Sequence, residues 1–134
     1  MVKPEIRLRV PGQREYALVL RLALGGVAIL KDLDAGTLDD LRNAADEACD
    51  CLLHQGQSVA WLELNVCDEG DRLTVSLLAE YDGETEGTCP DADETEVSRA
   101  VLETLIPVVA LNTAPCGRVE RIDLTLPKAV AVGA

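Results

Sequence analysis

A glutamate and a cysteine four residues apart, Glu47 and Cys51, are the side chains of this sequence best placed to do chemistry together. Both lie in the segment from Thr37 to His54, where a period of about 3.6 residues predicts an amphipathic helix with its polar residues on one side. Residues four apart are neighbours on a helix surface, so this carboxylate and this thiol share the rim of the polar face. We expect this helix to carry any chemistry of the chain, although the same pattern is typical of an ordinary helix that lies on a sheet with its charges in water.

The cysteines raise the question of a metal site. The sequence has five of them at irregular spacing: Cys49, Cys51, Cys67, Cys89 and Cys116. A site built from Cys49, Cys51 and His54 conflicts with helical geometry, because residues two apart point about 200° apart around the axis. No Cys-x-x-Cys pair occurs, and an odd number of cysteines without a secretory signal indicates reduced thiols. We therefore expect no metal site, and thiols that mostly fill small spaces in the core.

Composition and charge limit the classes of protein to which the chain can belong. Its 134 residues, 48% of them hydrophobic and none of them Phe, fit a single globular domain, residues 1–134, with a core of Leu, Val, Ala and Ile. A net charge of -12 argues against nucleic-acid binding, which needs clustered Lys and Arg, and suits a partner protein with basic patches. No apolar run reaches the roughly 18 residues that a membrane span needs, and the start MVKPEIRLRV lacks a signal-peptide core, so we expect a cytoplasmic protein.

The segments before the central helix predict a strand and a long buried helix. From Glu5 to Val10, apolar residues alternate with arginines, which indicates a strand with one buried face. The segment from about Gln13 to Leu30 is apolar around most of its circumference, so we expect one side to pack on the sheet and another to meet a neighbouring helix or a second chain. Lys31 to Gly36 connects it to the central helix, whose start we expect to be capped by Thr37 with Asp40.

Alternation of apolar and polar residues also predicts the rest of the sheet. The expected elements are the hairpin strands Ser58–Cys67 and Leu73–Ala79 around the turn Asp68–Asp71, the helix Glu94–Ile106, and the closing hairpin strands Val108–Asn112 and Arg118–Leu126. This order of elements fits an α+β fold: a two-layer α/β sandwich in which three helices cover one face of a mixed, mainly antiparallel five-stranded sheet.

The segment from Tyr81 to Glu94 holds six acidic residues and two glycines and is almost without apolar side chains. Carboxylates at this density repel one another at neutral pH, so we expect an exposed and mobile loop. It is either a passive solvated loop or an acidic docking segment for a partner.

Two stretches near the start of the chain resemble a known family. VPGQREYALVLRLALGGVA, from Val10 to Ala28, and LDDLRNAADEAC, from Leu38 to Cys49, are similar to the opening half of the anti-sigma-factor serine kinases of bacterial stress and sporulation control. These kinases belong to the GHKL, or Bergerat-fold, ATPase superfamily, and the resemblance follows the order and spacing of nearly the whole chain. It implies the same two-layer fold, a homodimer, and a partner that is a sigma factor or an anti-anti-sigma protein.

The resemblance also assigns roles to single positions, and several of the side chains that it implies are replaced here. Glu47 stands at the position of the family's general base, and Cys51 replaces the Asn that holds magnesium. Ala79 and Tyr81 replace the Asp and the Gly of the box that binds adenine. A shift of three residues would bring Asp82–Gly83 into that place.

At the start of the last helix, the resemblance implies a glycine-rich turn whose backbone amides hold the phosphates. The match at VLETL, from Val101 to Leu105, places Glu96 and Ser98 where the glycines would stand. A carboxylate repels phosphate, and a side chain blocks the close approach that glycine allows. Because the metal, adenine and phosphate contacts are all replaced, we expect no bound cofactor.

Three functions are compatible with the sequence. The first, which the replaced positions favour, is a regulatory protein of the anti-sigma type that binds a sigma factor or its antagonist without ATP. The second is an active serine/threonine kinase with a diverged pocket, which would use ATP and magnesium. The third is a structural or assembly role of the fold.

Overall fold

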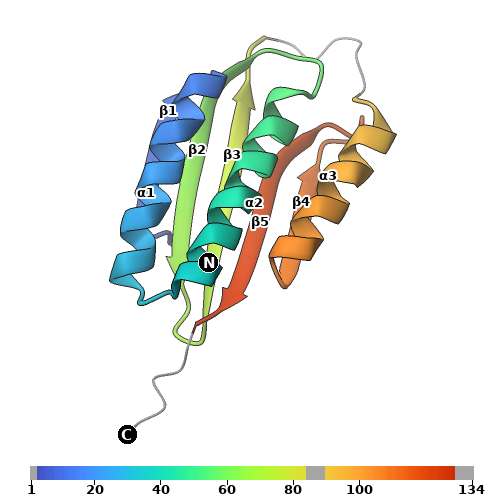
Figure 1. Ribbon diagram of the computed structural model, residues 1–134. Helices are drawn as coiled ribbons and strands as arrows, with labels where there is room; N and C mark the ends of the chain where they lie inside the picture. Colours follow the sequence, from blue (N-terminus) through green and yellow to red (C-terminus); the bar gives the residue numbers. More distant parts are fainter. Residues whose placement is uncertain (1–2, 84–89, 129–134) are drawn as a thin grey trace, which may run out of the picture.

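Strand residues of alternating polarity form one sheet whose apolar side is covered by helices (Figure 1). The computed structural model describes residues 3–83 and 90–128. The strands are β1 (Ile6–Pro11), β2 (Val59–Asp68), β3 (Arg72–Tyr81), β4 (Val108–Thr113) and β5 (Val119–Pro127), in the spatial order β1-β2-β3-β5-β4. The four pairings are antiparallel. The predicted two-layer α+β sandwich is therefore confirmed, with an antiparallel rather than a mixed sheet.

Three α-helices lie side by side on one face of this sheet, with α2 between α1 and α3 (Figure 1). The helices are the short 3-10 helix η1 (Arg14–Tyr16), α1 (Ala17–Leu30), α2 (Ala35–Leu53) and α3 (Ala92–Leu105). The helix predicted from Gln13 thus begins with a separate turn, and the last helix begins at Ala92 instead of Glu94. None of the helices in the described ranges has the length and hydropathy needed to cross a membrane.

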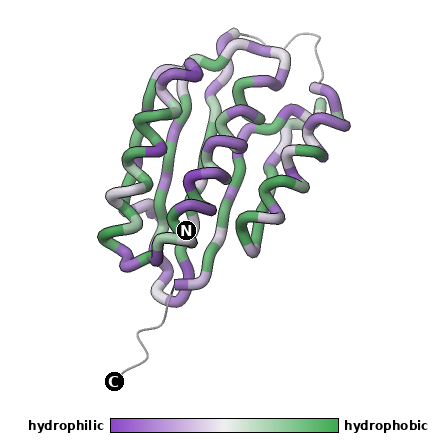
Figure 2. The backbone as a smooth tube through the Cα atoms, viewed as in Figure 1, coloured by the Kyte–Doolittle hydropathy of each residue, from purple (hydrophilic) through white to green (hydrophobic). Residues whose placement is uncertain are grey.

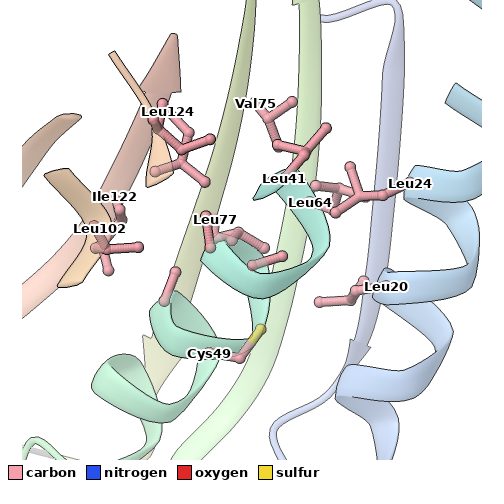
Figure 3. Close-up of a cluster of buried hydrophobic side chains, with 14 of the residues drawn as sticks. Leu20, Leu24, Leu41, Cys49, Leu64, Val75, Leu77, Leu102, Ile122 and Leu124 are labelled. Atoms are coloured by element: carbon pink, nitrogen blue, oxygen red, sulfur yellow. The ribbon is translucent and has the colours of Figure 1, made fainter. Parts of the chain in front are cut away.

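The core lies between the sheet and the helix layer (Figure 3). The inward residues of the central hairpin are fully buried, as their alternation predicts: Leu62, Leu64, Val66, Leu73, Val75 and Leu77. Leu20 and Leu24 of α1, Leu41 of α2 and Leu102 of α3 meet them from the helix side. Burying one such side chain contributes about 1.5–3 kcal/mol relative to leaving it exposed, so this cluster fixes the position of α2 against the sheet.

The start of α2 is fixed by Asp34. Its Oδ1 accepts a hydrogen bond of 2.7 Å from the backbone N–H of Thr37, and this bond lowers the pKa of Asp34. The predicted cap by Thr37 with Asp40 is wrong because the helix begins earlier, at Ala35. Thr37 therefore lies in the first turn, where its amide needs an acceptor, and Asp34 supplies that acceptor from the capping position.

The loop between β3 and α3 is shorter than the acidic segment from Tyr81 to Glu94, because both ends of that segment belong to regular elements. Tyr81 is the last residue of β3, and Asp91 caps α3 by accepting a hydrogen bond of 2.9 Å from the amide of Asp93. The predicted mobility and docking role fall on residues 84–89, which lie outside the described residues. They stay predictions for that part of the segment.

Asp68, at the end of β2, joins separate parts of the chain. Its carboxylate accepts hydrogen bonds of 2.9 and 2.8 Å from Nζ of Lys128, and it lies 2.9 Å from Nζ of Lys31. It also accepts a hydrogen bond of 2.9 Å from the amide of Gly70. The bonds from Lys128, Lys31 and Gly70 hold the pKa of Asp68 far below its usual range. This carboxylate thus ties the connector after α1 and the end of β5 to the central hairpin.

Replacing Asp68 by Asn is expected to destabilise the protein at neutral pH, because Lys128 loses its ion pair with Asp68 and Lys31 keeps only Glu5. An unfolded aspartate has a pKa of about 4. Since the folded-state pKa is lower, the wild type has this stabilisation above about pH 4 and loses it as the pH falls through the folded-state value. Urea unfolding at a series of pH values should show the difference between the two proteins shrinking in acid. Asp71→Asn in the same turn is the control, and an equal loss in that variant would contradict the role of Asp68.

Candidate functional site

A hollow of about 280 Å³ lies where the end of α2 faces the start of α3. Its lining comes from the last turn of α2 and the first turns of α3: Asp50, Cys51, His54, Gln55, Asp91, Glu94, Thr95 and Ser98. The two helices bring together residues that lie more than thirty positions apart in the sequence. Of the residues singled out from the sequence, Cys51, His54 and Ser98 line this hollow.

Cys51 is buried, contrary to its predicted place on the rim of the polar face. Burial is the main cause that raises the pKa of its thiol; a hydrogen bond with the Ser98 side chain opposes the shift, and the charge of Glu47 adds to it. The thiol is therefore protonated at neutral pH, and its sulfur accepts a hydrogen bond of 3.6 Å from the side-chain amide of Gln55. A neutral thiol is a poor ligand for magnesium, which prefers oxygen.

Tyr81 fills the space behind Cys51, beneath the last turn of α2. Its hydroxyl has one proton, which it shares between the carbonyl oxygens of Leu52, at 3.0 Å, and Val119, at 2.6 Å. The guanidinium of Arg118 lies over the ring, 4.5 Å from its centre. Burial raises the pKa of Tyr81, so its hydroxyl stays protonated and available as a donor. The ring occupies the position at which the resemblance to the kinase family implies a glycine.

Two glutamines complete this network, and no sequence pattern pointed to them. The side-chain amide of Gln55 donates to the carbonyl of Cys51 at 2.8 Å, and its oxygen accepts from the amide of Val119 at 2.8 Å. Arg118 donates to Gln57 at 2.7 Å and to Glu120 at 2.7 Å. The connection between α2 and β2 is thereby fixed to the start of β5. Only the three-dimensional structure brings these residues together, since they lie about sixty positions apart.

The other residues singled out from the sequence lie outside the hollow. Glu47 is half-buried on α2, close enough to Cys51 to affect its pKa. Ala79 lies on β3 opposite Leu62 of β2 and packs against the core. Glu96 is exposed and pairs with Arg99 at 3.2 Å. The structure therefore gathers Cys51, Ser98 and Tyr81 at one place, with Glu47 beside them, and leaves Ala79 and Glu96 apart.

The electrostatics of the hollow disfavour a phosphate. Asp50, Asp91 and Glu94 line it, and the first turn of α3 carries Asp93 and Glu94. A helix N-terminus attracts anions through its free amides and its dipole, but here the helix's own carboxylates occupy that position. Among the described residues, no group of three or more His, Cys, Asp or Glu side chains is placed to hold a metal ion.

Comparison with known proteins agrees with the family that the sequence resembles. Over 77 residues, which are 58% of this chain, the sequence is 32% identical to the anti-sigma-F factor RsbW of Mycobacterium tuberculosis, in two strains. The matched stretch is 46% of that protein, so the chain spans about half the length of the curated relatives it matches. No family model matches the chain. The chain is thus similar to an anti-sigma factor over more than half of its length.

Removing the hydroxyl of Tyr81 is expected to destabilise the fold. Tyr81→Phe leaves the carbonyls of Leu52 and Val119 without this donor, and an unsatisfied buried polar group costs about 1–3 kcal/mol. Urea unfolding of the variant measures this loss. Tyr16→Phe is the matched control, because the sequence has only two tyrosines and Tyr16 is exposed. Equal stability of Tyr81→Phe and the wild type would contradict the structural role of this hydroxyl.

Proposed function

We propose that this protein is a regulator of the anti-sigma type that acts by binding another protein and does not use a nucleotide. The likeness to an anti-sigma-F factor supports the class of function. The observation that carries the proposal is a large apolar surface on α1 that the other described residues leave uncovered. The contents of the hollow beside Cys51 support the absence of nucleotide.

The apolar surface of α1, which we call the α1 face, consists of Leu18, Val19, Leu22, Ile29 and Leu30. Leu18, Leu22 and Ile29 are 58%, 64% and 78% exposed, although α1 also buries Leu20 and Leu24 against the sheet. Figure 2 shows α1 hydrophobic over most of its length, whereas the visible side of α2 is largely hydrophilic. α2 therefore does not cover this side of α1, and a contiguous apolar patch on a helix marks an interaction surface.

Gly26 lies within the α1 face, and none of the described residues packs closely against it. A Cβ built at this position meets no atom within 4 Å, unlike one at Gly25, which would come within 2.7 Å of the Arg42 side chain. A glycine inside a helix costs about 1 kcal/mol relative to alanine. Because Gly26 has no side chain, another chain can approach the helix backbone closely at this position among exposed leucines. Such an approach would explain a glycine that costs helix stability.

The partners we propose for this protein are a sigma factor or an anti-anti-sigma protein, together with a second copy of the chain. Self-association would bury the exposed leucines of the α1 face, as the resemblance to a dimeric family implies. The net charge of -12 opposes it, so association between copies should strengthen as salt screens the repulsion. A partner with basic patches would gain from the same charge.

The proposal that nucleotide is not used rests on what fills the interior beside the hollow. The Tyr81 ring and Arg118 occupy the space beneath α2, the thiol of Cys51 is neutral, and carboxylates line the opening. Each of these disfavours a different part of a magnesium nucleotide: the base, the metal and the phosphates. A kinase role for Glu47 would need all three.

ATP and ADP are expected not to bind in the presence of magnesium. Isothermal titration calorimetry on the full chain should give no saturable heat, and the melting temperature should not move with added nucleotide. Cys51→Asn should not restore binding, because it leaves the Tyr81 ring and the carboxylates in place. Saturable binding at micromolar nucleotide would contradict the proposal.

The protein is expected to self-associate through the α1 face at tens of micromolar, as measured by light scattering. Leu22→Asp should shift it to the monomer, since a buried carboxylate in an apolar interface is costly. Val97→Asp, at a similarly exposed valine of α3, is the matched control and should leave the mass unchanged. Gly26→Ala should stabilise the monomer by about 1 kcal/mol and weaken association. The proposed interface would be contradicted if the wild type were monomeric, or if only Val97→Asp lowered the molar mass measured by light scattering.

A further inference from the structure

Arg42 of α2 is an arginine that the fold leaves without an acid. In the part of the chain that the structure describes, no carboxylate forms an ion pair with it, and its Nε is buried without a hydrogen-bond partner. The sequence has 24 acidic residues against 12 lysines and arginines, so an unpaired arginine does not follow from a shortage of acids. Arg21, which reaches from α1 to α2, does form an ion pair with Asp46. Arg42 is thus a half-buried cation with an unfilled contact.

The guanidinium of Arg42 lies against α1 at Gly25. A Cβ built on Gly25 would come within 2.7 Å of Nη2 of Arg42, so the guanidinium occupies the space that a side chain at this position would take. α1 and α2 run side by side in the helix layer, and Arg42 lies where they meet (Figure 1). Gly25 is buried there, which places the positive charge directly on the backbone of α1.

Gly25 also interrupts an apolar stripe along α1. Leu18, Leu22, Gly25 and Ile29 follow one another at intervals of four, three and four residues, so they lie within about 60° of one another around the axis. This is the spacing of the contact seam of a coiled coil. The three apolar members are 58%, 64% and 78% exposed. At the remaining position, the guanidinium of Arg42 stands where a seam would have an apolar side chain.

A charged group in an otherwise apolar seam selects the helix that can match it. An entirely apolar helix laid on this stripe would take water away from the guanidinium without giving it a hydrogen-bond acceptor, which is unfavourable. A carboxylate supplies that acceptor through charge-assisted hydrogen bonds. α1 itself contains no acidic residue, so α1 of a second copy cannot supply the carboxylate.

We propose that the stripe formed by Leu18, Leu22 and Ile29 binds a helix of a partner protein whose own apolar seam carries one carboxylate, placed opposite Arg42. From Leu18 to Ile29 the stripe spans about 16 Å, or about three turns of a helix. The net charge of -12 repels an acidic segment, so the remainder of the partner helix is apolar or basic. This inference rests on the proposed protein-binding role of the α1 face and names the chemistry of the segment that is bound there.

Self-association has a different side of the α1 face at its disposal. Val19, Gly26 and Leu30 lie about 90° around the axis from the stripe, on the side farther from α2. The open position at Gly26 is on this side. A second copy that packs there leaves Arg42 unpaired and does not replace the partner helix.

Two capped peptides of about 18 residues, long enough to form a helix, test the proposal. Both are built from alanine and glutamine with leucines at seam spacing, and they differ only at the central seam position, which is glutamate in one and glutamine in the other. Amide shifts of the full chain, followed by NMR, should move along α1 and around Arg42 with either peptide. The glutamate peptide should bind about tenfold more tightly, as expected for one charge-assisted contact. Salt should reduce this preference.

Matched variants separate the contact with Arg42 from general attraction. Arg42→Gln should bind the two peptides equally, a result that loss of an apolar contact would not give. Arg14→Gln removes the same charge from an exposed arginine four residues before Leu18 and should keep the preference for glutamate. Leu22→Asp should bind neither peptide, because it places a carboxylate within the apolar stripe.

The proposal is overturned if neither peptide gives a saturable shift at millimolar concentration, or if the wild type does not distinguish the two. It is equally overturned if Arg42→Gln keeps the preference, if Arg14→Gln loses it to the same extent, or if Leu22→Asp binds like the wild type. The spectra show whether each variant is folded, and the comparison of the two peptides on the wild type needs no variant.

A second copy of the chain is the other occupant that the experiment can reveal. Self-association that weakens in Arg42→Gln, while neither peptide binds, would assign the stripe to a second copy and overturn the proposal. Nucleotide titration and light scattering of the wild type test the proposed function without these peptides. A failed peptide titration therefore leaves that function standing, and the reverse also holds.

Discussion

The hydroxyl of Tyr81 connects the last turn of α2 to the first residue of β5, and the rest of the candidate site depends on this connection. Its one proton is shared between the carbonyl of Leu52 at the end of a helix and that of Val119 at the start of a strand. Arg118 covers the ring, and Gln55 bridges the same two elements through Cys51 and Val119. Side chains of the protein thereby fill the space beneath α2. The end of this helix is held in place by the fold and leaves no room there for a ligand.

The same chain leaves other surfaces open. Within residues 3–83 and 90–128, no other element covers the apolar α1 face. A fold that closes its interior and exposes an apolar helix face is suited to binding proteins. This division explains why the likeness to an anti-sigma factor can coexist with the replacement of the side chains that the kinase family uses.

The sequence predicted the fold well because buried residues recur at a regular spacing along a strand or a helix. Alternation along β2 and β3 identified Leu62, Leu64, Leu73 and Val75 as inward residues, and all are fully buried. The cap of α2 was misplaced, because Thr37 and Asp34 are both good capping residues and the pattern does not say which one starts the helix. The contacts of Tyr81 and Gln55 were missed because they join residues far apart in the sequence, where no periodicity operates. Burial of Cys51 was missed for a related reason: the helical pattern does not reveal that α3 packs over that side of α2.

The central claim is that the interior beneath α2 is closed by the protein's own side chains and takes no nucleotide. Amide hydrogen exchange of the full chain, measured with and without saturating magnesium ATP, tests it most directly. The account predicts slow exchange at the end of α2 and at the start of β5 in the free protein, with no change when nucleotide is added. Fast exchange of these amides in the free protein, followed by protection on adding nucleotide, would contradict it.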